Sequence, residues 1–238
     1  MEEPLWEAFV EALRLIRTLD PEVIEIAWRS LRLAATSSAI AFFLIALPLG
    51  TLIHFNDFRG KRVVISIIQT MFALPAVAVG LITYTLLSRS GPLGGLEWYL
   101  TPSAIVFGQA ILITPVMLGL VISALGAVDK SIPETAKALG ASRLQMYLVS
   151  IREARFGVVT ALVMGFGRAV SEVGVSMMVG GNIRGFTRTL TTAIALETAK
   201  GERELALALG VILIILAFGL NLTILLLQYR KIPWHFWS

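Results

Sequence analysis

The chain has 238 residues, of which 56% are hydrophobic and only 15% are charged, and its mean hydropathy is +0.80. Soluble domains carry roughly 25% charged residues, so this composition predicts a membrane protein. There is no cysteine, which excludes disulfides, thiol catalysis and thiolate-bound metals. The net charge of +4 comes without a basic run longer than two residues, so nucleic acid is not an expected partner.

Residues 1–32 predict an amphipathic helix that lies at the membrane interface. Charged side chains occupy one side of this helix, and the other side carries apolar residues at helical spacing: Trp6, Phe9, Val10, Leu13 and Ile16. The dipeptide Asp20-Pro21 marks a break in this helix and the start of another.

Five apolar segments follow, at residues 33–53, 63–88, 98–128, 156–183 and 205–229. Each is long enough to span a membrane, since a span needs about 20 apolar residues. Pro48 predicts a kink inside the first segment, and Pro75 lies near the middle of the second. We therefore predict an all-α membrane protein, with five transmembrane helices in residues 33–230 and a cytoplasmic tail at 231–238.

The orientation follows from the basic residues beside the span ends. Total Lys and Arg counts on the two sides do not separate them, but Arg59-Gly60-Lys61-Arg62 and Arg230-Lys231 are tight clusters on one side. That side is expected in the cytoplasm. The loop at residues 129–155 and the C-terminus are then cytoplasmic, and the N-terminus lies outside.

The loop at residues 129–155 predicts a bent helical hairpin. Ser131 and Glu134 have the spacing of a capping box, and Ser142 and Gln145 repeat it. Between them, Gly140 can take the left-handed conformation that ends a helix. Taken alone, these residues describe either an ordinary capped hairpin or a surface that docks on a partner.

This loop resembles the coupling loop of the membrane subunits of ATP-binding-cassette (ABC) importers, because E-T-A-K-A-L-G-A-S is similar to their E-A-A-x-x-x-G motif. The resemblance implies a helix that docks in a cleft of a separate ATPase subunit. It assigns this role to Glu134, Thr135, Ala136, Lys137, Leu139, Gly140 and Ala141. The chain departs from the family at Ser150-Ile151-Arg152-Glu153, where an Ile-x-Leu-Pro ending is usual.

The fourth apolar segment contains Arg168, Ser171 and Glu172. A charge inside the membrane costs roughly 2.5–3.5 kcal/mol on insertion scales, so such residues face a bundle interior or a watery cavity. Arg168 and Glu172 are four residues apart and are expected to share a helical face. They are either a structural ion pair or part of the translocation path and its gate.

The segment after this span predicts a polar outer vestibule, formed by Asn182, Arg184, Thr187, Arg188 and Thr189. An oxyanion could meet either arginine through charge-assisted hydrogen bonds. The alternative is a solvated loop that touches a binding protein or lipid headgroups.

Both regions also resemble permeases for molybdate, tungstate and sulfate, and they are most similar to tungstate permeases. The resemblance is carried by G-F-G-R-A-V-S-E-V-G-V-S-M-M-V-G-G-N-I and G-F-T-R-T-L-T-T-A-I. It implies a MetI-like fold in the cytoplasmic membrane and a homodimer with its path on the twofold axis. It further implies an ATPase dimer below and a periplasmic or lipid-anchored substrate-binding protein above. The expected function is oxyanion import by alternating access, with tungstate first and molybdate or sulfate next.

The chain contains no G-x-x-x-x-G-K-[ST] phosphate loop, so ATP hydrolysis is expected from another subunit. We expect no catalytic residue, no cofactor and no metal site, since the only histidines are His54 and His235. The alternative function is an ATP-independent secondary transporter or channel that uses Arg168 and Glu172. That class predicts inverted internal repeats, and no two halves of the sequence match.

Overall fold

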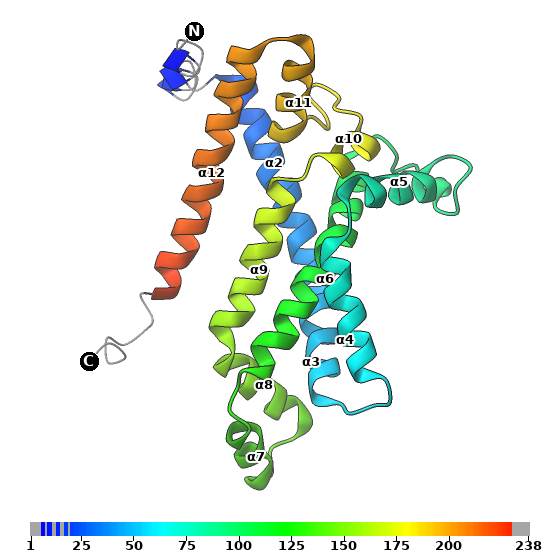
Figure 1. Cartoon of the computed structure of the whole chain (residues 1–238), viewed down its shortest axis with the longest axis vertical. Coiled ribbons are helices and arrows are strands. Elements are labelled where there is room, and N and C mark those ends of the chain that lie inside the picture. Colours follow the sequence, from blue (N-terminus) through cyan, green and yellow to red (C-terminus); the bar gives the residue numbers. More distant parts are fainter. Residues whose placement is uncertain (1–5, 8, 11–12, 15–16, 19, 230–238) are drawn as a thin grey trace. The chain divides into compact units, whose positions relative to one another are not determined.

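The structure is a computed structural model that describes residues 6–7, 9–10, 13–14, 17–18 and 20–229. Every regular element in these ranges is a helix, which confirms the predicted all-α class. Figure 1 shows them in chain order, with the bounds α2 Pro21–Ala39, η1 Ile40–Ala46, α3 Leu47–Phe55, α4 Lys61–Thr70, η2 Met71–Ala73, α5 Ala76–Leu87, η3 Gly94–Leu96, α6 Pro102–Gly126, α7 Ser131–Ala138, α8 Arg143–Glu153, α9 Arg155–Val170, α10 Gly174–Gly180, α11 Leu190–Lys200 and α12 Arg203–Tyr229.

The five predicted spans appear as continuous helices, as bent pairs of helices, or as part of a longer helix. Within the described residues, two continuous helices are long and apolar enough to cross a membrane, Pro21–Phe55 and Pro102–Gly126. The second and fourth predicted spans are each a bent pair of helices, α4–η2 with α5 and α9 with α10. The fifth lies within α12, which contains the apolar stretch Leu205–Gly219.

The expected helix start at Asp20-Pro21 is confirmed. Oδ1 of Asp20 accepts hydrogen bonds from the backbone N–H groups of Glu22 and Val23, at 3.0 and 3.1 Å, and so caps α2. The helix then runs without interruption to Phe55. The predicted division after residue 32 therefore falls inside a helix and not at a break.

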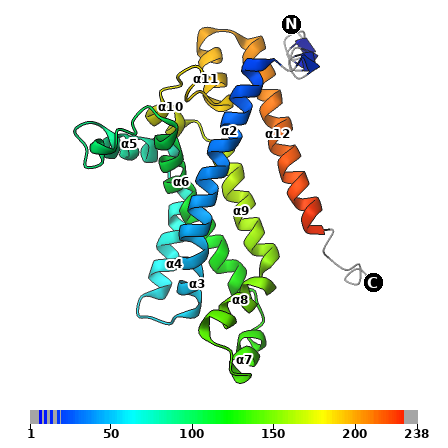
Figure 2. The ribbon, with the colours of Figure 1, turned by 180° about the vertical axis from the view of Figure 1, so that it is seen from behind.

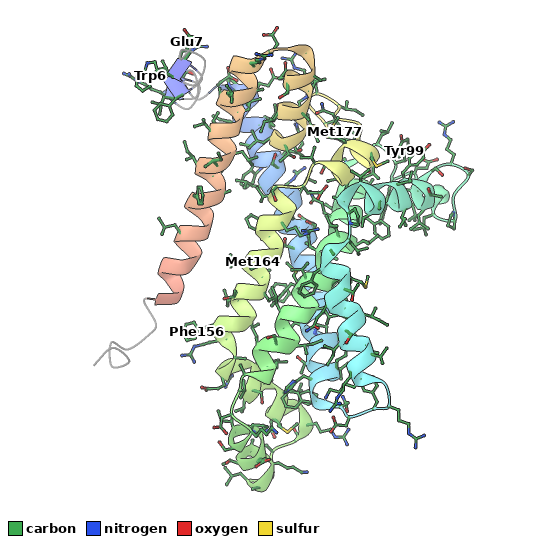
Figure 3. All side chains as sticks on the ribbon, viewed as in Figure 1. Trp6, Glu7, Tyr99, Phe156, Met164 and Met177 are labelled. Atoms are coloured by element: carbon green, nitrogen blue, oxygen red, sulfur yellow. The ribbon has the colours of Figure 1, made fainter. Side chains whose placement is uncertain are left out.

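The earlier amphipathic stretch is described only in part. Trp6, Phe9, Val10 and Leu13 are all exposed, and the rings of Trp6 and Phe9 stack with centroids 6.1 Å apart. Figure 3 labels Trp6 and its neighbour Glu7. The prediction for Ile16 and the predicted tail at 231–238 lie outside the described residues.

The chain divides into two compact units. The first unit comprises the described parts of Met1–Ser37, Pro75–Gln109 and Gly167–Ser238. Its apolar core joins α2, α11 and α12 through Val23, Ile26, Leu190, Ala193, Ala208, Leu209 and Ile212. Figure 2 shows α2 beside α12 in this unit. Helices α5 and α10 also pack closely, because a Cβ on Gly174 would lie only 3.2 Å from the Val77 backbone nitrogen.

The second unit comprises Ser38–Leu74 and Ala110–Phe166. Glycines permit close approach here too: a Cβ on Gly50 would lie 2.8 Å from a Val121 side-chain methyl group, and one on Gly165 would overlap Met117. The stacked rings of Phe55 and Tyr147, 4.8 Å apart, join the end of α3 to α8. This contact holds one side of the α7–α8 hairpin against the unit.

Candidate functional site

The α7–α8 hairpin, which we call the elbow, turns at Gly140. The φ angle of Gly140 is +83°, in the left-handed region that L-residues other than glycine rarely adopt. The N–H groups of Gly140 and Ala141 donate to the carbonyls of Lys137 and Ala136, both at 3.0 Å. This is the Schellman pattern, which satisfies the last carbonyls of α7. The predicted glycine turn is confirmed.

The two predicted caps of the elbow have different outcomes. Ser142 caps α8 with the expected box: its hydroxyl accepts from the Gln145 N–H at 3.4 Å, and Gln145 accepts from the Ser142 N–H at 2.8 Å. The predicted box of Ser131 with Glu134 is wrong, because Ser131 already lies inside α7. Asp129 caps instead, since its Oδ1 accepts from the Ser131 N–H at 2.8 Å. The hydrogen bond from the Ser131 backbone lowers the pKa of Asp129.

The elbow exposes apolar side chains that nothing in the described chain covers. Leu139 at the turn is 83% exposed and Leu144 at the start of α8 is 66% exposed. Leu148 and Val149 are also exposed. Several exposed apolar side chains within one short polar hairpin indicate an interaction site. Of the residues assigned to coupling, Glu134, Thr135, Lys137, Leu139 and Gly140 are exposed, and Ala136 and Ala141 are half-buried.

The departure from the family motif has a simple local structure. Arg152 and Glu153 complete the last turn of α8 and are exposed. The N–H of the buried Ala154 closes the helix on the Ser150 carbonyl at 2.8 Å, and α9 begins at the next residue. The Arg155 guanidinium then lies over the ring of Phe156, 4.8 Å from its centre (Figure 3). The chain thus passes from α8 to α9 without a proline.

The second candidate region is the break between α9 and α10. Helix α9 ends at Val170, so the prediction that Arg168 and Glu172 share a helical face is wrong. Glu172 is buried, and its Oε1 accepts from the Val175 N–H at 2.9 Å in the first turn of α10. The Ser171 hydroxyl is exposed and turns back to the Gly167 carbonyl at 3.0 Å. Arg168 is half-buried on the last turn of α9.

Gln109 on α6 holds this break in place, and the sequence analysis did not single it out. Its side-chain amide is 3% exposed and donates to the Ala169 carbonyl at 3.2 Å and to the Ser176 hydroxyl at 3.4 Å. Its Oε1 accepts from Ser37 at 3.0 Å. Thr191 adds a bond to the Glu172 carbonyl at 2.8 Å. A strongly polar side chain in the middle of an apolar segment was the only signal for Gln109.

The polar segment after α10 is mostly occupied with internal hydrogen bonds. The buried Thr187 hydroxyl donates to the Gly180 carbonyl at 2.5 Å and accepts from the Ile183 N–H at 2.9 Å. Thr189 is buried and caps α11 through a box with Thr192. Asn182 has a positive φ of 51° and donates to the Thr192 carbonyl at 3.2 Å. These side chains shape the segment.

The two arginines of this segment both approach Glu22 at the start of α2. Arg184 is exposed and binds both Glu22 carboxylate oxygens, at 2.8 and 2.5 Å, which raises the pKa of Arg184. Arg188 is largely buried, with its Nη1 3.8 Å from the same carboxylate. Arg29, also buried, donates to the Arg188 carbonyl at 3.0 Å. Glu22 and Arg29 are site residues that the sequence analysis did not identify, because their partners lie about 160 residues away.

Among the residues that the structure describes, no three His, Asp or Glu side chains gather in a way that could hold a metal ion. The chemistry available at both regions is therefore hydrogen bonding, ion pairing and apolar contact. The described residues form only helices, with membrane-length helices and an exposed, capped elbow, which is the architecture that the sequence resemblance to importer permeases implies.

Comparison with known proteins identifies the family. Residues 43–231 match the family model of the binding-protein-dependent transport system inner membrane component, and the chain belongs to this family. It is a membrane permease subunit of an ABC transporter and not an enzyme. The family and the fold expected from the sequence are thus confirmed.

Relatives and solved structures agree on this assignment. The chain is 38% identical to the tungstate uptake system permease protein TupB of Peptoclostridium acidaminophilum, over 95% of this chain and 99% of that protein. It is 46% identical to a probable anion ABC transporter permease of Haloferax volcanii, over 74% of this chain and 78% of that protein. The MetNI methionine ABC transporter matches with a TM-score of 0.70 at 20% identity, over 98% of this chain and 100% of that chain, which shows the shared fold.

Proposed function

We propose that this permease carries a tetrahedral oxyanion, tungstate first, from a substrate-binding protein into the cell. The proposed assembly is a homodimer in the cytoplasmic membrane with an ATPase dimer on the cytoplasmic side. The single observation that carries the coupling part of this proposal is the exposed, capped elbow, which has apolar side chains in need of a partner.

The elbow is the proposed contact with the ATPase. ATP binding closes the ATPase dimer, the elbow residues Glu134–Ala141 move with it, and the permeases change between inward- and outward-facing states. Two caps and a Schellman turn make the elbow stiff, so that it can transmit a displacement. In this orientation the elbow and the C-terminus are cytoplasmic, and the N-terminus is outside.

The substrate assignment rests on relatives. Two proteins named tungstate uptake system permease TupB are 38% and 40% identical to this chain over 95% and 91% of its length. The molybdenum permease ModB of Escherichia coli is more distant, at 28% over 77%. The order of substrates that we propose follows this order of similarity.

The proposed path includes Arg168, Ser171 and Glu172 at the α9–α10 break. Broken helices at membrane depth are typical of transporter substrate sites, because unwound backbone is tolerated there only around a cavity or inside protein. The outer vestibule is proposed at Asn182–Thr189. Within it, Arg184 is the exposed cation available to an arriving anion, although Glu22 competes for it.

The substrate test is uptake by the reconstituted complex of permease, ATPase and binding protein. We expect ATP-dependent accumulation of labelled tungstate, with molybdate and then sulfate as weaker competitors. Uptake that is indifferent to tungstate contradicts the substrate assignment. Uptake that continues with a hydrolysis-deficient ATPase instead favours the ATP-independent alternative.

The coupling test compares two glycines with the same geometry. Gly140 and Gly60 have φ angles of +83° and +89°, and in both a Cβ would meet no neighbour within 4 Å. Gly140→Ala and Gly60→Ala therefore impose a similar backbone strain of about 1–2 kcal/mol. We expect only Gly140→Ala to reduce transport-coupled ATP hydrolysis. Equal effects of the two substitutions count against a specific role for the elbow.

A further inference from the structure

The first unit contains a cavity of about 330 Å³ at the start of α2, beside α11 and α12. Its lining includes three cations and three carboxylates, which we call the rim: Arg184, Arg188, Lys200, Asp20, Glu22 and Glu197. Glu197 is buried and binds Lys200 at 3.0 Å, Glu22 binds Arg184, and Asp20 caps α2. Within the residues that the structure describes, these contacts leave Arg188 as the cation of this group whose guanidinium donates no hydrogen bond.

Arg188 lacks the hydrogen bonds that its burial calls for. Its side chain is only 15% exposed, and its Nη1 lies 3.8 Å from Glu22, which is beyond hydrogen-bonding distance. Its Nε is buried and has no acceptor in the part of the chain that the structure describes. A guanidinium has five N–H donors and suits bidentate binding of an anionic oxygen group. An anionic group bound in this cavity would supply the hydrogen-bond acceptor that the Arg188 guanidinium lacks.

The apolar residues that line the cavity, which we call the floor, are Val23, Ile26, Ala193, Leu205 and Leu209. Both helices that supply most of this floor begin their apolar stretches here, α2 at Pro21 and α12 at Leu205. Trp28, two turns into α2, is 65% exposed, and exposed tryptophans are enriched at the membrane–water interface. The cavity thus lies at the boundary between headgroups and acyl chains.

We propose that this cavity binds a zwitterionic phospholipid, with its phosphate on Arg188 and its ammonium group beside the rim carboxylates. An apolar floor suits an acyl chain and does not suit a hydrated inorganic dianion. The balanced rim charge disfavours a headgroup with net negative charge. A phosphatidylethanolamine can place its phosphate on the free donors of Arg188, its ammonium group near the carboxylates, which can accept further hydrogen bonds, and an acyl chain on the floor. This site is separate from the proposed coupling elbow and does not depend on which anion is transported, but it shares Arg184 and Arg188 with the proposed outer vestibule.

The test is titration of the full-length permease, purified in mild detergent, with short-chain phosphatidylethanolamine, followed by native mass spectrometry. Phosphatidylglycerol of the same chain length, inorganic phosphate and tungstate are the comparison ligands. We expect phosphatidylethanolamine to bind best, and neither inorganic anion to displace it. Arg188→Gln should weaken its binding by about tenfold or more, as expected for a lost charge-assisted contact.

The matched control is Arg89→Gln, which removes an exposed arginine outside the cavity and should leave lipid binding unchanged.

Leu205→Trp tests the site without altering any charge. Leu205 is 37% exposed at the cavity, so a larger side chain at this position would fill part of the cavity. It should weaken phosphatidylethanolamine binding even if Arg188→Gln fails to fold.

Three results overturn the proposal. Displacement of the lipid by phosphate or tungstate shows a site for free anions. Equal binding of phosphatidylglycerol shows that the rim does not select a zwitterion. Unchanged binding in Leu205→Trp shows that the lipid is held elsewhere on the permease.

Discussion

The elbow and the α9–α10 break satisfy their polar groups in opposite ways. In the elbow, every capping bond joins residues at most five apart, such as Ala141 to Ala136. At the break, Gln109 and Thr191 reach backbone carbonyls 60 and 19 residues away. The elbow exposes its apolar side chains, whereas Gln109 and Glu172 are buried.

This difference indicates that the elbow is a contact surface, whereas the α9–α10 break is held in place by neighbouring helices. The elbow folds on its own local bonds, so its exposed face remains free for a partner. The break depends on other helices, and a change in those helices will change its geometry. Substitutions at the break should therefore reduce the stability of the permease itself, and substitutions at the elbow should reduce binding of the ATPase.

The largest effect is expected for Gln109→Leu. This substitution leaves the Ala169 carbonyl and the hydroxyls of Ser37 and Ser176 without their amide partner in a buried site. We expect a loss of about 2–3 kcal/mol, roughly 1 kcal/mol for each partner. Thermal unfolding of the purified permease measures it. Gln69→Leu, at an exposed amide on α4, is the control and should change stability little.

Glu172 comes next, because its carboxylate both caps α10 and belongs to the proposed path. Glu172→Ala removes the acceptor of the Val175 N–H and should cost about 2 kcal/mol. Glu172→Gln keeps an oxygen acceptor and should largely retain stability. If uptake also survives in Glu172→Gln, the carboxylate has only a capping role. A stable Glu172→Gln permease without uptake supports a role for the charge on the path.

The contrast also explains what the sequence could predict. Helix type, the Gly140 turn and the Ser142 cap follow from local patterns, and the structure agrees with them. Of the five predicted spans, two lie in continuous helices, two are bent pairs and the fifth is a shorter apolar stretch in α12. The capping role of Asp129 was missed because two neighbouring acceptors competed for one helix start, and spacing alone favoured Ser131.

Contacts between residues far apart in the sequence could not be predicted from local patterns. The end of α9 at Val170 depends in part on the Gln109 amide, so Arg168 and Glu172 do not lie on the one continuous helix that their spacing predicted. The link from Glu22 to Arg184 spans 162 residues, and no periodicity within a single segment reveals it. Partners of this kind become visible only when the helices are packed.

A smaller effect is expected for Leu139→Ser at the elbow. Leu139 is 83% exposed, so the substitution should leave thermal unfolding of the permease unchanged. Full burial of a leucine contributes about 1.5–3 kcal/mol, and a leucine covered in part by a partner contributes less, so the affinity for the ATPase should fall by about tenfold, or roughly 1.4 kcal/mol. Leu96→Ser, at an exposed leucine on η3, is the control. Unchanged ATPase affinity in Leu139→Ser would rule out Leu139 as an anchor.

The smallest effect is expected for Asp129→Ala, which removes the cap of α7 without touching the exposed leucines. Hydrogen exchange should become a few-fold faster in α7 and stay unchanged in α8, which Ser142 caps independently. Because the pKa of Asp129 is lowered in the folded elbow, the cap is present above the ordinary aspartate pKa. It is lost as the pH falls through the lowered value. Acid should therefore loosen α7 in the wild type and have little further effect in Asp129→Ala, and equal acid responses would mean that another group holds the start of α7.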